Sequence, residues 1–230
     1  NFIFDILVNT HLMREEGSTA DVVLFIQMSF DSAADKLTGY DEITLKQMNV
    51  NIHYIPKNEG ESIERLMMDK FRTLSLTDYD RVLYLDSDIR TRGSLDYLFE
   101  LSLNGTLKEN FAVAGANEPV TGSMFMLSPR DGDWDRVLEI IQDKEKREVG
   151  TTEPNQFDAG IGWGQAFKGD DSFVMSDGSE GNTWDFPGAL SAQGLLYHWI
   201  KYEKKSASIL LSDTIEHWGA GKDGKLNREK

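Results

Sequence analysis

The stretch Arg81-Val82-Leu83-Tyr84-Leu85-Asp86-Ser87-Asp88-Ile89 joins an apolar run to two carboxylates. The run before Asp86 is apolar on both faces, which predicts a strand buried in a parallel sheet. Residues two apart in an extended chain point to the same face, so Asp86 and Asp88 can present their oxygens together. Neighbouring carboxylates repel each other unless a cation lies between them, and a divalent ion is the usual solution. One interpretation is therefore a metal site at the carboxyl end of a strand. The other is that Asp86 caps a turn and that Ser87 and Asp88 merely begin a loop.

The composition limits the classes of protein to which this chain can belong. Its 230 residues fit one domain, or one domain with an elaboration. With 24 Lys and Arg against 39 Asp and Glu, the net charge is −15, which weighs against an extended nucleic-acid surface. An anionic nucleotide can still bind where a metal and a few local bases screen its phosphates. The absence of cysteine excludes a disulfide framework and leaves the redox compartment open.

No apolar stretch is long enough to span a membrane, and no signal peptide is visible. The chain starts at Asn1 and not at a methionine, so a preceding leader, anchor or first strand stays open.

The hydrophobic pattern alternates between strand-like and helix-like segments. Ser62 is expected to cap a helix carrying Ile63, Leu66, Met67, Phe71 and Leu74, and Ser94 to cap the helix after the Asp86 strand. The other expected helices cover residues 2–13, 134–141 and 190–202, and the other expected strands cover 21–28, 51–55, 111–114, 124–127 and 209–211. This alternation predicts an α/β fold with a doubly wound sheet.

A second chemical cluster runs from His217 to Lys222, where a histidine, two glycines and a lysine fall within six residues. Glycines let the backbone approach a ligand closely, an imidazole can ligate a metal, and an ammonium can neutralise a phosphate. The alternative is a glycine-rich exit loop with a surface lysine.

Two other motifs fit known patterns less well. The segment from Asp131 to Asp135 resembles the start of a calcium loop, but Arg136 stands where that loop requires glycine, and helix capping explains it better. A phosphatase of the haloacid-dehalogenase type also places D-x-D after an apolar strand. Its motif usually continues with Thr or Val two residues after the second Asp, where this chain has Arg90.

Several segments together resemble glycogenin-like glycosyltransferases of the GT-A fold, in the order in which that family carries them. They are Lys70–Leu76, Tyr79–Asp88, Ser94–Glu100, Thr121-Gly122 followed by Met124–Pro129, Gln193–Leu196 and His217–Lys222. The resemblance covers the chain from about Asp21 to Lys222. It implies a Rossmann-like α/β fold with a mostly parallel central sheet, and a retaining transfer of a hexose from a UDP-sugar.

The resemblance also assigns roles to individual residues. It implies that Asp86, Asp88 and His217 hold Mn²⁺ or Mg²⁺, a shell of oxygens and imidazole that suits such a metal. It places Gln193 at the donor sugar as a catalytic residue. The substrate-binding set that it implies is Lys70, Ser87, Thr121, Gly122, Gly219, Gly221 and Lys222.

The sequence departs from the family pattern where catalysis expects carboxylates. Ala192 and Ala189 stand in place of two aspartates that position the donor sugar, and Val120 stands in place of an asparagine. The terminal motif is one residue shorter than usual, and the family's first strand, with its uracil-binding loop, is missing. A loop carboxylate could substitute for the lost ones, the candidates being Asp158, Asp170, Asp171, Asp177 and Asp185. The alternative function is a nucleotide-sugar-binding protein with weak or no transferase activity.

The sequence therefore predicts a single glycosyltransferase domain over residues 1–222 and a solvated tail over 223–230. The expected partners are a UDP-sugar donor and a carbohydrate or protein acceptor, with no nucleic acid and a possible homodimer. Relatives implied by the resemblance work in the cytosol or in the Golgi lumen, and the sequence does not choose between these compartments.

Overall fold

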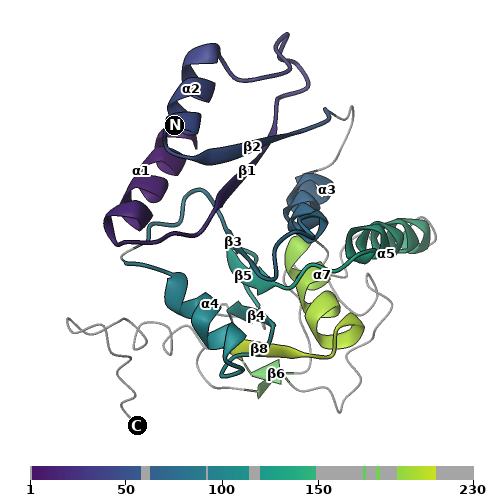
Figure 1. Ribbon diagram of the computed structural model, residues 1–230. Coiled ribbons are helices and arrows are strands. Elements are labelled where there is room, and N and C mark those ends of the chain that lie inside the picture. Colours follow the sequence, from purple (N-terminus) through teal and green to yellow (C-terminus); the bar gives the residue numbers. More distant parts are fainter. Residues whose placement is uncertain are drawn as a thin grey trace. The chain divides into compact units, whose positions relative to one another are not determined.

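The structure, a computed structural model, describes residues 2–57, 63–91, 93–113, 120–148, 173–174, 180–181 and 191–210. The chain divides into two compact units. Unit 1 comprises Asn1–Ser62 and Asp86–Glu100, and unit 2 comprises Ile63–Leu85 and Leu101–Lys230. The boundary at Leu85 places the two aspartates in unit 1. The apolar strand before them, labelled β3 (Val82–Leu85) in Figure 1, belongs to unit 2.

Unit 1 contains a parallel pair of strands covered by helices. Its elements are α1 (Phe2–Glu15), β1 (Val22–Gln27), α2 (Gly39–Gln47) and β2 (Val50–Ile55). The strands pair from Val22↔Val50 to Gln27↔Ile55. Both helices and β2 contribute to one buried cluster through Ile6, Leu45 and Val50. The predictions of a helix near the start and of two strands at 21–28 and 51–55 are confirmed.

Helix α2 was not predicted, although its start carries a recognisable signal. Thr38 is the N-cap, and its hydroxyl accepts a hydrogen bond from the Asp41 amide at 3.2 Å. The same hydroxyl donates to the Asp41 carboxylate at 2.7 Å. A threonine followed three residues later by an acidic side chain is close to the capping-box pattern, which marks a helix N-terminus.

The elements of unit 2 mix helices and strands along the chain, and apart from two short strands at 173–174 and 180–181 they follow the predicted order. They are α3 (Ile63–Met68), the 3₁₀ helix η1 (Asp69–Ser75), β3 (Val82–Leu85), β4 (Asn110–Val113), β5 (Met124–Leu127), α5 (Asp133–Glu148), β6 (Phe173–Val174), β7 (Glu180–Gly181), α7 (Ala192–His198), the π-helical segment η3 (Trp199–Glu203) and β8 (Ala207–Leu210). Helix α4 (Asp96–Leu103) begins in unit 1 and ends in unit 2. None of the helices in the described ranges is long and apolar enough to cross a membrane.

The four-stranded sheet of unit 2 is mixed, whereas the sequence predicted a mostly parallel one. Its strand order is β3-β5-β4-β8, in which β5 pairs antiparallel with both β3 and β4, and β4 pairs parallel with β8. The connection from β4 to β5 spans residues 114–123, which is shorter than the dozen or more residues of a parallel crossover. The apolar run of β3 therefore packs in an antiparallel pair, and its residues are half-buried. The molecule remains a mixed α/β protein with parallel strands in two of its described sheets.

The expected helix over residues 63–74 changes type at Asp69. In a 3₁₀ helix, side chains three residues apart lie above one another. Met68, Phe71 and Leu74 follow that spacing and are 4%, 0% and 0% exposed. Leu66 and Met67, expected on the apolar face, are about two-fifths exposed at 40% and 41%.

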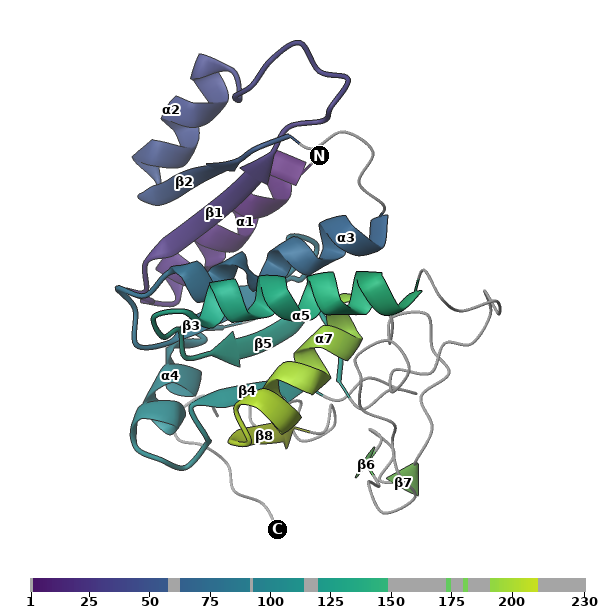
Figure 2. The same cartoon turned by 90° about the vertical axis from the view of Figure 1, so that its right-hand side faces the viewer.

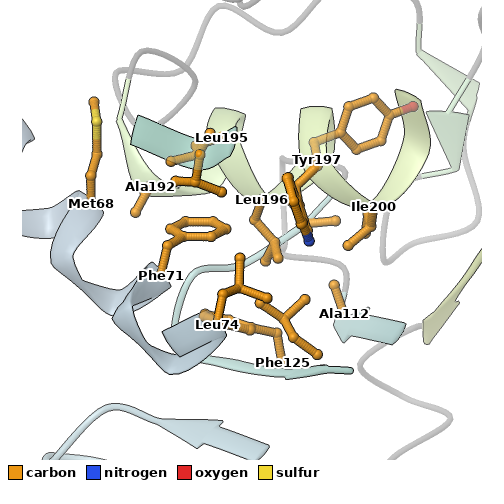
Figure 3. Close-up of a cluster of buried hydrophobic side chains, with 14 of the residues drawn as sticks. Met68, Phe71, Leu74, Ala112, Phe125, Ala192, Leu195, Leu196, Tyr197 and Ile200 are labelled. Carbon is orange, nitrogen blue, oxygen red and sulfur yellow. The ribbon is translucent and has the colours of Figure 1, made fainter. Parts of the chain in front are cut away.

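One apolar cluster joins these residues to the sheet and to the helices on it. It takes Phe125 from β5, Val137 from α5 and Leu196 from α7, and Figure 2 shows α5 and α7 running beside the strands. Figure 3 shows Phe71 and Leu74 pointing toward the side chains of α7. The burial fixes η1 against α7, and therefore Lys70 near the first residues of α7.

Polar contacts fasten the far end of the α7 segment to α5. Arg136 donates two hydrogen bonds to the Glu203 carboxylate, at 3.0 and 2.9 Å, and Lys204 donates to Asp133 at 2.6 Å. The Arg136 hydrogen bonds hold the pKa of Glu203 below its usual value. Both ends of the segment that carries Gln193 are thus anchored within unit 2.

Candidate functional site

The two aspartates lie in a tight turn and not on an extended strand. Strand β3 ends at Leu85, and the Ile89 amide donates to the Asp86 carbonyl at 3.1 Å. Asp86 and Ser87 are half-buried, and Asp88 is exposed. The prediction that both carboxylates lie on one face of a strand is therefore wrong for this segment. The structure agrees with the turn of the simpler interpretation, and a turn of this kind still leaves Asp88 open to solvent cations.

Helix α1 fastens this turn within unit 1. The Asn9 side-chain amide donates to the Ser87 carbonyl at 3.3 Å and to the Ile89 carbonyl at 2.5 Å. The next residue, Arg90, forms an ion pair with Asp5, and this hydrogen bond lowers the pKa of the Asp5 carboxyl. These contacts join residues about eighty positions apart in the chain, so a local sequence pattern cannot predict them.

Three predicted donor-site residues meet inside unit 2. The Lys70 ammonium on η1 donates to the Gly122 carbonyl at 3.1 Å. A Cβ placed on Gly122 would lie 3.3 Å from Gln193 Cγ and 3.7 Å from Lys70 Nζ. Since the three residues come from segments far apart in the chain, folding creates a small polar cluster of a cation, a carbonyl and an amide side chain, here called the Lys70 cluster.

Aromatic side chains support the Lys70 cluster from one side. The Lys70 ammonium lies 5.3 Å from the centre of the Tyr84 ring, close enough for a cation–π attraction. Tyr84 stacks on Phe125 with ring centres 4.8 Å apart, and Phe125 stacks on Phe71 at 5.8 Å. The sequence indicates only that Tyr84 is an apolar strand residue, so this contact was not predicted.

Thr121, the neighbour of Gly122, is held by its backbone and its side chain. Its amide donates to the Val113 carbonyl at 2.7 Å, and its hydroxyl lies 2.8 Å from the Ser123 hydroxyl. These bonds fix the segment just before β5, and so the position of the Gly122 carbonyl that Lys70 contacts.

Part of the predicted metal and phosphate site lies outside the described residues. This holds for His217, Gly219, Gly221, Lys222, Ala189 and the loop carboxylates at 158, 170, 171, 177 and 185. Within the described ranges, no group of three or more His, Cys, Asp or Glu side chains is arranged to hold a metal ion. The Asp86 and Asp88 oxygens are donors of the kind that Mn²⁺ and Mg²⁺ accept.

Ala192, where the resemblance expects a carboxylate, is part of the hydrophobic core. It is the first residue of α7, is 2% exposed, and belongs to the cluster with Met68 and Phe71 (Figure 3). A charged carboxylate in this position would be buried among apolar groups at a large desolvation penalty.

A comparison with known proteins finds a glycosyltransferase. Part of the chain is 32% identical, over 106 residues, to UDP-glucuronate:xylan alpha-glucuronosyltransferase 1 of Arabidopsis thaliana. The match covers 41% of this chain and 15% of the plant protein. No family model matches the chain. The matched segment is therefore a small part of the plant protein's length.

Proposed function

We propose that this chain is a metal-dependent glycosyltransferase of the GT-A fold that moves a hexose from a UDP-sugar with retention at the anomeric carbon. The similarity to a glucuronosyltransferase supports a nucleotide-sugar donor, and UDP-glucuronate is one candidate beside UDP-glucose and UDP-galactose. The acceptor is a carbohydrate or a protein.

The observation that carries the proposal is the meeting of Lys70, Gly122 and Gln193. Each was assigned to the donor from a different sequence segment, and they lie together in unit 2. A fixed ammonium can neutralise a phosphate oxygen, and the Gln193 amide can donate to and accept from sugar hydroxyls. The cation–π contact with Tyr84 restrains the ammonium, which lowers the entropy lost when it binds an anion.

Asp86 and Asp88, together with His217, are the residues that would hold the divalent ion. Bound there, the ion would neutralise the charge that develops on the leaving diphosphate, as a Lewis acid does. Ser87, Gly219, Gly221 and Lys222 complete the proposed phosphate-binding set.

Ala192 favours a second candidate, a protein that binds a nucleotide sugar but transfers it slowly or not at all. Its methyl group is buried in the core, so no carboxylate at this position orients the donor sugar. Loss of such orientation can lower a rate by orders of magnitude without removing binding.

The first experiment measures the melting temperature with UDP and Mn²⁺, separately and together. Because a ligand that binds the native state stabilises it, we expect the pair to raise the melting temperature of the wild-type protein more than either ligand alone. Asp88→Asn should abolish the metal-dependent part. Asp78→Asn, an exposed aspartate before β3 at the other end of the strand, should behave as wild type. No response of the wild-type protein to either ligand would contradict both candidate functions.

The second experiment separates enzyme from binding protein. The protein is incubated with Mn²⁺ and each of the three UDP-sugars, and released UDP is measured with and without oligosaccharide acceptors. Release that depends on Asp88 supports the transferase. Intact binding with no release under any condition supports the binding protein.

A further inference from the structure

We propose that Asn9 of α1 is a positioning residue that holds the Asp86–Ile89 turn in the conformation that binds a divalent cation. The inference rests on the proposed function for its consequence, metal binding, but the contact itself is independent of it. Asn9 would touch neither metal nor nucleotide and would act through Asp86 and Asp88.

The two hydrogen bonds of Asn9 lie on either side of Asp88 in the chain. One side-chain amide nitrogen donates to two carbonyls of the same turn, that of Ser87 just before Asp88 and that of Ile89 just after it. Within the turn, the Ile89 amide donates to the Asp86 carbonyl. The Asn9 bonds therefore restrain the backbone on both sides of the exposed Asp88 carboxylate.

Asp5 strengthens the same arrangement from one helical turn away. Residues i and i+4 lie on one face of a helix, so Asp5 and Asn9 are presented to the turn together. Asp5 pairs with Arg90, directly after the turn. Farther along, Ser18 donates to the Asp96 carboxylate at 2.5 Å, and the Thr19 amide donates to it at 3.2 Å. The segment 86–96 is thus tied at several points to α1 and the residues that follow it.

The orientation of the Asn9 amide makes the role specific to an asparagine. Its nitrogen faces the two carbonyls, and its Oδ1 is buried with no hydrogen-bond partner. A leucine keeps the shape and removes both donors. An aspartate keeps the shape and places a carboxylate oxygen against two carbonyl oxygens, which repel it.

The expected effect follows from the fraction of molecules in which the turn is correctly formed. An apparent dissociation constant rises in inverse proportion to the fraction of the binding-competent conformation. If loss of the amide lowers that fraction to roughly a tenth, the affinity for Mn²⁺ falls about tenfold. We expect about tenfold for Asn9→Leu and a larger loss for Asn9→Asp.

The first test follows the turn without any metal. Hydrogen exchange of the Ile89 amide reports opening of the turn, and it should become about tenfold faster in Asn9→Leu. His11→Ala is the matched control, because His11 lies on the same helix, is exposed and pairs with Glu15. It should leave the exchange rate unchanged. An unchanged rate in Asn9→Leu overturns the proposal, and Asn9→Ala replaces that variant if it fails to fold.

The second test measures free Mn²⁺ by electron paramagnetic resonance during titration of the protein, without nucleotide. Asn9→Leu should weaken binding in the wild-type background and have no further effect on Asp88→Asn, since a positioning residue acts through the residue it positions. Equal losses in both backgrounds, or wild-type affinity in Asn9→Leu, overturn the inference while the metal site stands. Faster exchange in a protein that binds no Mn²⁺ overturns the proposed function and the metal-positioning role, and leaves a purely structural contact.

Discussion

Gly122 shows how a single missing side chain shapes the Lys70 cluster. The residue is buried, and the space that its Cβ would enter is bounded by the Gln193 side chain and the Lys70 ammonium. Any larger residue must displace one or both of these groups. The glycine is therefore explained by close approach, and not by an unusual backbone conformation.

Gly122→Ala should weaken binding of the UDP-sugar while leaving the fold intact. A contact of 3.3 Å to Gln193 Cγ is tight, and the flexible glutamine would move by a few tenths of an ångström. We expect a loss of several-fold in affinity by isothermal titration, and a change of less than about 1 kcal/mol in the free energy of unfolding.

Gly39→Ala is the control for this substitution. Nothing lies within 4 Å of the Cβ that it would add, so both affinity and stability should stay near wild type. Equal affinity for the Gly122→Ala and wild-type proteins would remove Gly122 from the donor site.

For individual residues, the sequence predicted the members of the Lys70 cluster but not the side chains that hold the site residues in place. Lys70, Gly122 and Gln193 stand in motifs that resemble a known family, and the structure brings them together. Asn9 stands in no such motif, and Tyr84 stands in one that assigns it no role at the donor. Their roles arise from contacts with residues far along the chain, which local periodicity does not encode.

The start of helix α2 is determined by its N-cap residue, Thr38. Thr38 satisfies the Asp41 amide, one of the amides at the helix start that have no partner within the helix. The helix is short and mostly polar, and Leu45 is its buried contact to the core of unit 1. The cap should therefore matter more here than in a long amphipathic helix.

Thr38→Ala should lower the free energy of unfolding by about 1 kcal/mol, the usual effect of removing a threonine cap. The measurement is urea-induced unfolding followed by circular dichroism. Thr44→Ala is the control, because Thr44 is half-buried on the same helix, lies outside the cap, and donates its hydroxyl to the Tyr40 carbonyl. That substitution should be neutral or slightly stabilising, since alanine favours helix. Equal destabilisation by both changes would show that the cap is unimportant.

Element types were predictable where the hydrophobic period was clear, and strand directions were not. The positions of β1, β2, β4, β5 and α5 follow from alternation and helical spacing. The β3 run looked like a central parallel strand because an apolar sequence fits both parallel and antiparallel neighbours. The change from α-helix to 3₁₀ helix at Asp69 was equally hidden, since Phe71 and Leu74 fit either period until packing decides.

The net charge of −15 acts on ligands across the whole molecule. A negative protein attracts divalent cations and repels anions, and salt screens both effects. The two ligands of the proposed site therefore experience the surrounding field with opposite sign.

Raising KCl from about 20 to about 300 mM should weaken Mn²⁺ binding several-fold, because screening removes the attraction. UDP binding without metal should stay constant or strengthen over the same range. Calorimetric titration of each ligand alone makes the comparison. A steep loss of metal-free UDP affinity with salt would show that nearby bases, such as Lys70, outweigh the net charge.

The division of contacts between Leu85 and Asp86 bears on how this protein can be redesigned. A redesign guided by the motif alone would transfer the nine residues Arg81–Ile89 to another protein as one unit. The contacts divide that stretch in two, since its strand is built with β5 and its turn is built with α1. A chimera that imports the turn from another protein should import the matching first helix with it, and can leave the strand in place.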